Sequence, residues 1–288
     1  MTKDHQPGTL YVVPTPIGNL QDITERARNV LAGVTTIAAE DTRHCRKLLQ
    51  LLDISAARIV PVHEHNEAAA ALGIVGLLEQ GETVALVSDA GTPLVSDPGH
   101  LVLRGVWDAQ SAGADIRVVP LPGPSALLTA LSACPLALHL FSFAGFLPAK
   151  AAGRVARLQE LLALPGAFVV FEAPHRIRAA LADLAELAAQ RRVFVARELT
   201  KLHESLLLGS AAEVAQQLVA DDALRGEFVV VVEGPPEKGR GLDVDAQALL
   251  FALAEELPPA QAAKVTARLT GGKRADYYAL LQAARDDP

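Results

Sequence analysis

The chain has 288 residues, of which 50% are hydrophobic and 20% are charged. A chain of this size and composition can bury a large core, and its length favours about two domains. Its formal net charge of -7 means that most of the surface repels nucleic acid, so such a partner would need a local basic patch.

Several broad classes of protein are excluded by the same data. The sequence has no fixed-period repeat, no low-complexity tract and no apolar run of membrane-spanning length. The polar residues 1–8 lack the apolar core of a secretion signal, and Cys45 and Cys134 are too few for a disulfide framework. We therefore expect a cytoplasmic protein with buried thiols and no contact with a membrane.

In the first half of the chain, short apolar runs alternate with amphipathic stretches. The apolar runs predict strands at residues 10–13, 35–39, 58–62, 83–87 and 115–119. Apolar residues at three- and four-residue spacing predict helices at 22–31, 43–51, 67–79 and 99–110. This order indicates an α/β domain with a largely parallel sheet, in which ligands bind beyond the carboxyl ends of the strands.

The second half continues with a further α/β unit, joined to the first near Pro135. Its strands are predicted at 139–143, 167–171, 193–197, 205–209 and 227–233, and its helices at 154–164 and 176–190. The glycine, proline and charge content of 234–241 is typical of an exposed linker, and two or three short helices follow it. The predicted domains are therefore residues 9–135, 136–234 and 235–288.

The last of these units is basic although the chain as a whole is acidic. Within residues 258–285 a single acid, Asp276, faces the basic residues Lys264, Arg268, Lys273, Arg274 and Arg285. This asymmetry favours an anionic partner. Tyr277 and Tyr278 could stack on RNA bases, although aromatic residues beside leucines are more often part of a helix core.

Familiar catalytic signatures are absent from the sequence. It has no P-loop, no G-x-G-x-x-G turn after the first strand, no nucleophile elbow and no H-E-x-x-H helix. His63 and His65 have a spacing that suits a pair of metal ligands on a strand or loop, but no third ligand accompanies them. We therefore expect no bound metal.

Three loops rich in small residues and prolines follow predicted strands, at residues 13–19, 88–99 and 120–126. Small residues let a ligand approach the backbone, and prolines fix the turn. Each of the last two loops alone is better explained as an ordinary tight turn. All three lie at one edge of the predicted sheet, and together they predict a ligand site there.

These loops belong to a set of motifs that occurs in order along nearly the whole chain, at residues 13–20, 39–43, 63–67, 88–99, 122–124, 145–148 and 197–201. With this set the chain closely resembles the tetrapyrrole methylase superfamily, and within it the branch that methylates RNA of the small ribosomal subunit. The resemblance implies a tetrapyrrole-methylase-like fold of two α/β domains with an S-adenosylmethionine cleft between them, followed by a small helical C-terminal unit.

The resemblance also implies a homodimer that methylates the ribose 2′-hydroxyl of a decoding-centre cytidine in 16S rRNA, within the small subunit. The methionine part of the cofactor would lie against Asp89, Ala90, Gly91, Thr92 and Pro93, with Asp89 as polar anchor. Further cofactor neighbours would be Pro14, Ser125 and Ala126 in the first domain, and Gly145, Phe146, Thr200 and Phe228 in the second.

A ribose hydroxyl is a poor nucleophile until a base removes its proton, so we expect a general base near the cofactor. Glu40, Asp41 and Arg43 follow a predicted strand and could orient the ribose. They are equally well explained as a helix start, with Asp41 or Thr42 as cap and Glu40 paired with Arg43.

His63 and His65 also follow a strand, and a neutral imidazole accepts a proton near pH 7. The alternative is that Asn66 caps the next helix and both histidines are solvated.

The predicted RNA contacts are Arg197, Lys201, Lys264, Arg268, Lys273 and Arg274. Charged residues at strand ends, such as Arg197, ordinarily form solvated ion pairs that contribute little to stability. The resemblance favours a functional role for them over that interpretation. Two other functions stay open: a small-molecule tetrapyrrole methyltransferase, and a ribosome-associated protein that binds the cofactor without catalysis.

Overall fold

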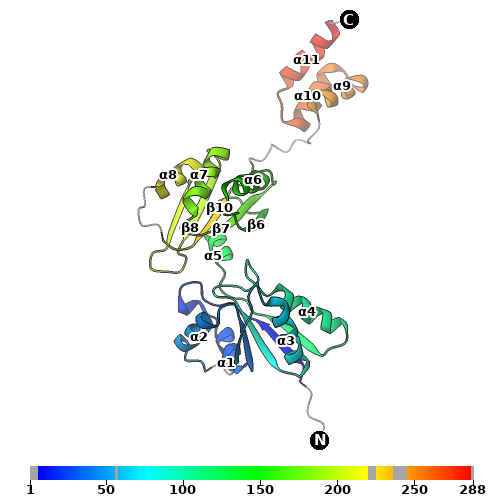
Figure 1. The fold of residues 1–288 in the computed structure, drawn as a ribbon. Helices are drawn as coiled ribbons and strands as arrows, with labels where there is room; N and C mark the ends of the chain where they lie inside the picture. Colours follow the sequence, from blue (N-terminus) through cyan, green and yellow to red (C-terminus); the bar gives the residue numbers. More distant parts are fainter. Residues whose placement is uncertain (1–5, 56–57, 220–224, 236–244, 287–288) are drawn as a thin grey trace. The chain divides into compact units, whose positions relative to one another are not determined.

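The structure is a computed structural model that describes residues 6–55, 58–219, 225–235 and 245–286. The chain forms two compact units, residues 1–234 and 235–288 (Figure 1). The first unit contains two five-stranded sheets, and the described part of the second contains three helices.

The first sheet is parallel throughout, as its apolar strands predict. Its strands are β1 (Gly8–Val12), β2 (Thr36–Ala39), β3 (Arg58–Pro61), β4 (Thr83–Val87) and β5 (Ile116–Pro120). They pair in the order β3-β2-β4-β1-β5, each neighbour parallel to the next. The loops that follow these strands therefore meet at the carboxyl edge of one sheet.

Helices cover both faces of this sheet (Figure 1). Helices α1 (Glu25–Gly33) and α2 (Thr42–Leu51) pack on the face to which Ile37 and Ala85 point. Helices α3 (Glu67–Glu79) and α4 (His100–Ser111) pack on the opposite face, against Ala38 and Val84. Successive strand residues thus bury their side chains in two different cores, which is why these strands are apolar without alternation.

The second sheet is mixed. Its strands are β6 (Phe141–Phe146), β7 (Ala167–Glu172), β8 (Arg192–Arg197), β9 (Ser205–Ser210) and β10 (Phe228–Val232), in the order β6-β7-β10-β8-β9. The pair β6–β7 is parallel, and the other neighbours are antiparallel.

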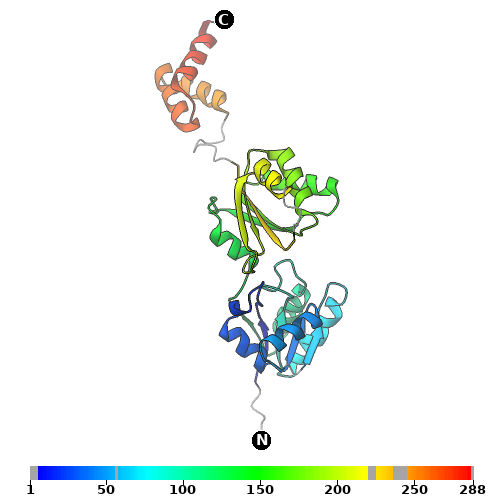
Figure 2. The ribbon, with the colours of Figure 1, turned by 90° about the vertical axis from the view of Figure 1, so that its left-hand side faces the viewer.

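The two faces of the second sheet are covered differently (Figure 2). Helices α6 (Ala151–Leu162), α7 (Ile177–Ala188) and α8 (Ala211–Val219) bury one face. The other face packs against α5 (Ala126–Ala133) and against Ile17, which belongs to the loop after β1. The first-domain loop and the second sheet thus share one hydrophobic cluster.

Some predicted bounds and elements need correction. The predicted helix 22–31 is instead a short 3₁₀ helix, η1 (Leu20–Asp22), followed by α1, because the side chain of Thr24 caps α1 at Ala27 N. The strand predicted at 139–143 lies later, as β6. Helix α8 was not predicted.

Of the two thiols, that of Cys45 is buried and that of Cys134 is half-buried.

The C-terminal unit is a bundle of α9 (Ala246–Glu256), α10 (Pro259–Thr270) and α11 (Arg274–Asp286). Its small core includes Leu250 and Leu281. The turn before α11 is tight: Gly271 has the left-handed φ of 75°, and the Tyr277 hydroxyl lies 2.8 Å from Thr270 Oγ1.

Most of the predicted linker, from residue 236, lies outside the described residues. No helix in the described part of the chain has the length and apolarity to cross a membrane.

Candidate functional site

The loops after β1, β4 and β5 are tied together by hydrogen bonds. Gly91 and Thr15 exchange two backbone hydrogen bonds of 2.9 Å, and Thr92 Oγ1 donates to Pro124 O at 2.9 Å. Gly91 has a φ of 80°, and a Cβ added there would lie 3.2 Å from Ile17 Cγ2. Glycine is required at this position because both the backbone angle and the space oppose a side chain.

The loop after β4 is held in an unfavourable conformation. Leu94 and Ser96 both have a φ of 74°, in the left-handed region that non-glycine residues rarely occupy. At its end, the buried Glu67 accepts hydrogen bonds at Oε1 from Gly99 N and Leu101 N, each 2.8 Å long. Strain of this kind persists where the surrounding structure enforces it, and it often marks functional sites.

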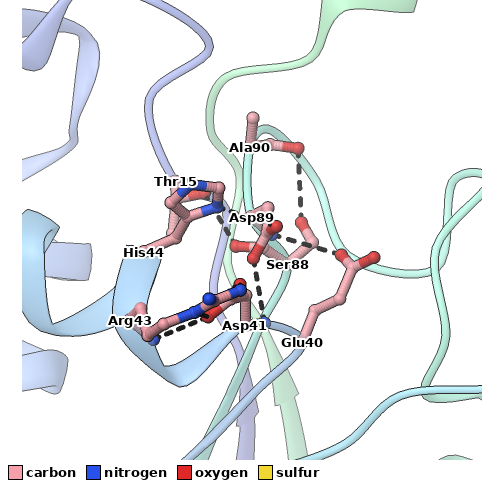
Figure 3. A network of polar contacts seen from close by, with 8 residues as sticks. All are labelled: Thr15, Glu40, Asp41, Arg43, His44, Ser88, Asp89 and Ala90. Carbon is pink, nitrogen blue, oxygen red and sulfur yellow. Dashed lines mark hydrogen bonds and ion pairs between the residues drawn. The ribbon is translucent and has the colours of Figure 1, made fainter.

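A polar network joins the ends of β2 and β4 (Figure 3). Asp89 accepts a hydrogen bond at Oδ1 from Asp41 N at 3.0 Å, and its Oδ2 lies 3.0 Å from His44 Nδ1. Asp89 N lies 3.4 Å from Glu40 Oε2, to which it donates. The interaction with Asp89 raises the pKa of His44. Asp89 is therefore the residue that locks the two strand ends to each other.

A cavity of about 490 Å³ opens beside this network, with walls from both α/β halves of the first unit. One wall consists of residues from the first-domain loops: Ile17, Glu40, Asp89, Ala90, Gly91, Thr92, Val95, Ser96, Asp97, Ser125 and Ala126. The other wall consists of residues from the second sheet and its loops: Phe146, Phe171, Glu172, Ala173, Pro174, His175, Glu227, Phe228 and Val229.

The two walls differ in chemistry. Glu40, Asp89 and Asp97 give the first wall three carboxylates. Burial, together with the neighbouring charges of Glu40 and Asp89, raises the pKa of Asp97 to about 6. Burial also raises the pKa of Glu40. The second wall carries the rings of Phe146 and Phe171, packed edge to face with their centroids 5.8 Å apart, beside the carboxylates of Glu172 and Glu227. A ligand with a cationic part and a flat apolar part fits this arrangement.

The predicted cofactor neighbours gather at this cavity, with four exceptions. Those that line it are Asp89, Ala90, Gly91, Thr92, Ser125, Ala126, Phe146 and Phe228. Pro14 and Pro93 are buried residues of the same loops, and Gly145 directly precedes Phe146. Thr200 lines a second cavity of about 390 Å³, which shares Ile17 and Ser125 with the first.

The structure separates the predicted acid–base residues. Glu40 lines the cavity. Asp41 caps α2 through a 2.7 Å bond from Arg43 N and pairs with the exposed Arg43 side chain, which holds the pKa of Asp41 well below its usual range. Our alternative reading was therefore right about the cap. It was wrong about the ion pair, because Arg43 pairs with Asp41 and not with Glu40.

His63 and His65 are exposed and are not part of the cavity wall, although their rings lie near each other, with centroids 6.1 Å apart. Asn66 occupies the N-cap position of α3, as the alternative predicted, but its side chain makes no capping hydrogen bond. Its amide instead closes a local turn, accepting from His63 N at 2.8 Å and donating to Pro61 O at 3.0 Å.

The predicted RNA contacts fall into two groups. Arg197 Nε donates to Arg225 O, and its guanidinium lies over the Phe228 ring; Lys201 pairs with Glu198 and Glu227 at 2.7 and 3.1 Å. Lys264, Arg268, Lys273 and Arg274 are exposed on the C-terminal unit.

Sequence reasoning missed several residues of the site. Asp97 and the segment 172–175 line the cavity. Glu172 is the last residue of β7; it is 1% exposed and pairs with Arg176 at 3.3 Å. Its position after five apolar residues of a strand was the available signal. Within the described residues, no group of three or more His, Cys, Asp or Glu side chains could hold a metal ion.

Two family models match the chain. Residues 9–215 match the model described as Tetrapyrrole (Corrin/Porphyrin) Methylases, and residues 240–285 match that of the RsmI C-terminal HTH domain. The chain therefore belongs to the tetrapyrrole methylase family. The resemblance carried by the sequence motifs is confirmed, and with it the prediction of a methyltransferase.

Curated relatives place the chain more narrowly. It is 46% identical to the protein named Ribosomal RNA small subunit methyltransferase I of Xylella fastidiosa (strain Temecula1), over 94% of this chain and 98% of that protein. It is 45% identical to the protein of the same name from Escherichia coli O157:H7, over 96% and 95%.

A solved structure shares the fold. Uroporphyrin-III C-methyltransferase from Thermus thermophilus, complexed with S-adenyl homocysteine, superposes with a TM-score of 0.51 at 19% identity, over 78% of this chain and 97% of that one.

Proposed function

We propose that this protein transfers a methyl group from S-adenosylmethionine to the ribose 2′-hydroxyl of a decoding-centre cytidine in 16S rRNA. The observation that carries the proposal is the cavity with three carboxylates on one wall and the rings of Phe146 and Phe171 on the other, in a chain that is 46% identical to a ribosomal RNA small subunit methyltransferase I. The reaction would take place in the cytoplasm, on the small ribosomal subunit.

The residues of the cavity fit the cofactor. S-adenosylmethionine carries a positive sulfonium and an ammonium group, and carboxylates stabilise such charges. Glu40 and Asp89 supply them on one wall, where the small residues Ala90 and Gly91 leave room for close approach. Phe146 and Phe171 offer an apolar surface on which an adenine ring can stack.

When bound, the cofactor supplies an electrophilic methyl group. The chain contributes positioning, since holding the attacking oxygen in line with the methyl group accounts for much of the rate. The tied loops around Thr15, Gly91 and Thr92 are suited to this because they form a rigid wall. The chain also contributes a base for the hydroxyl proton. Glu40 is the predicted candidate that lines the cavity, whereas Asp41 is committed to Arg43.

We further propose that the C-terminal unit contacts the RNA. Lys264 and Arg268 lie four residues apart on α10, and Lys273 and Arg274 follow in the turn into α11. All four are exposed, and no ion pair involves them within the described residues. Exposed cations of this kind neutralise phosphates without reading sequence.

The homodimer is retained as a proposal from the resemblance. The edge strand β9 exposes Leu206 and Leu208, with 45% and 42% of their surface accessible, and an apolar sheet edge of this kind is suited to contact with another protein surface. Light scattering on the purified protein gives its mass directly.

One experiment separates this function from its alternatives. The protein is incubated with methyl-labelled S-adenosylmethionine and, in parallel, with small ribosomal subunits, naked rRNA or uroporphyrinogen. The proposal predicts label on RNA ribose in the subunits. Label on uroporphyrinogen alone would identify a small-molecule methyltransferase, and cofactor binding without any transfer would identify a non-catalytic protein.

A further inference from the structure

The carboxylates on the first wall of the cavity differ in how far they are committed to other groups. Asp89 receives the Asp41 amide and faces the His44 ring, both at 3.0 Å. Glu40 receives the Asp89 amide at 3.4 Å. Asp97 interacts with the Ser88 hydroxyl, and no cation pairs with it in the described part of the chain. Asp97 is thus the carboxylate most available to a ligand.

The loop holds Asp97 at the cavity at a conformational cost. Ser96, the residue before Asp97, has a φ of 74°. The residue after Asp97 is Pro98, whose ring fixes its backbone angle φ. The buried Glu67 fastens the next residue, Gly99, by its backbone N–H. The strained backbone at Ser96 and the hydrogen bond at Gly99 together hold the Asp97 carboxylate in position before any ligand binds.

We propose that Asp97 is the catalytic base that accepts the proton of the ribose hydroxyl, an assignment that rests on the proposed function. The hydroxyl oxygen forms a bond to the methyl carbon, and the bond from that carbon to sulfur breaks with its electron pair going to sulfur. The hydroxyl proton passes to the Asp97 carboxylate. Charge and atoms balance, because the positive charge of the sulfonium is lost as the carboxylate becomes neutral.

The charged surroundings of Asp97 suit this role. Glu40 from the end of β2 and Asp89 from the β4 loop face it, His44 of α2 offsets Asp89, and Glu172, His175 and Glu227 line the opposite wall. The resulting pKa of about 6 leaves Asp97 ionised at neutral pH and makes it a stronger base than an ordinary carboxylate.

The test compares Asp97→Asn with Asp97→Glu and with Asp108→Asn, the same substitution at an exposed position of α4. Each full-length variant is assayed for methyl transfer to small ribosomal subunits across pH, and for binding of S-adenosylhomocysteine and S-adenosylmethionine by calorimetry. A positioned base contributes on the order of 100-fold to 10,000-fold, so Asp97→Asn should lower kcat by about 100-fold or more. Asp97→Glu should recover part of this loss, and Asp108→Asn should match the wild type.

Two further readouts distinguish proton transfer from binding. In the wild type, kcat/KM should rise with an apparent pKa near 6, and this limb should vanish in Asp97→Asn. Independently of activity, a carboxyl carbon-13 signal that titrates near pH 6 should be missing from the Asn variant.

Three results would overturn the assignment. Asp97→Asn could keep its kcat within about threefold; it could lose cofactor affinity alone, with kcat intact at saturation; or it could retain the pH limb, in which case Glu40→Gln identifies the alternative base. A wild-type protein that binds S-adenosylhomocysteine but methylates no RNA would refute the proposed function itself, and the role of Asp97 with it.

Discussion

Removing the Glu67 carboxylate should destabilise the first unit and loosen the loop that forms the cavity wall. Glu67 is 6% exposed, and its Oε1 accepts the Gly99 and Leu101 amides at the start of α4, both at 2.8 Å. A hydrogen bond to a charged group contributes about 1.5–3 kcal/mol, and a buried donor left without a partner costs about 1–3 kcal/mol. We therefore expect Glu67→Ala to lower the free energy of unfolding by about 3 kcal/mol or more.

The conservative variant Glu67→Gln separates the effect of the charge from that of the hydrogen bonds. Glu67→Gln keeps an oxygen that can accept the same amides but loses the charge, so its cost should be about 1 kcal/mol. Both variants can be measured by urea unfolding followed by the fluorescence of Trp107, because this single tryptophan lies in α4, the helix that Glu67 caps.

Glu79→Ala is the matched control, since Glu79 is an exposed residue at the end of the same helix, α3. It should change the stability by less than about 0.5 kcal/mol. A Glu67→Ala variant that is as stable as the control would contradict this role of the Glu67 carboxylate. Weaker binding of S-adenosylhomocysteine should accompany the loss of stability in Glu67→Ala.

Three further predictions concern the cavity and the C-terminal unit. Gly91→Val should weaken cofactor binding by about tenfold or more and destabilise the fold by about 1–3 kcal/mol, because valine is strained at a φ of 80° and meets Ile17; unchanged affinity in calorimetry would exclude the loop from the site. Asp89→Asn should lower the pKa of His44 toward its ordinary value, because the carboxylate that raises it is lost; a proton NMR titration with an unmoved His44 pKa would contradict the network. Replacing Lys264 and Arg268 by Gln should weaken RNA binding and reduce the slope of log K against log salt by about 0.7–0.9 per lost phosphate contact, with cofactor affinity retained. The same substitutions at Arg26 and Lys47, exposed cations of the first domain, serve as the control.

Local patterns in the sequence predicted many of the elements. Strand β4 and helix α3 have the bounds that the apolar patterns gave, since each pattern reports burial along a single element. The antiparallel pairing of β10 with β7 and β8 depends on contacts between distant segments, which no local pattern encodes. Helix α8 was missed because its alanine-rich sequence carries few large apolar residues to mark the period.

The candidate site was predictable where composition is unusual. Glycine and proline at residues 88–99 marked the cavity loop, because close approach and fixed turns require them. Glu67 gave no such signal, since a buried and a solvated glutamate look alike in sequence. Asp97 lies within the predicted loop. Its neighbours at the cavity are Glu40 and Asp89, which come from other segments of the chain, so its surroundings could be seen only in the folded structure.

The most direct test of the account is to map the methyl group on the RNA. Small ribosomal subunits from cells that lack the enzyme are incubated with the protein and S-adenosylmethionine, and the extracted 16S rRNA is cleaved by alkali. Because alkaline cleavage proceeds through the free 2′-hydroxyl, a ribose-methylated nucleotide resists it. We predict one newly resistant bond, at a cytidine of the decoding centre, which the wild type forms and Asp97→Asn does not. Methylation on a base, or an unchanged cleavage ladder with the wild-type protein, would contradict it.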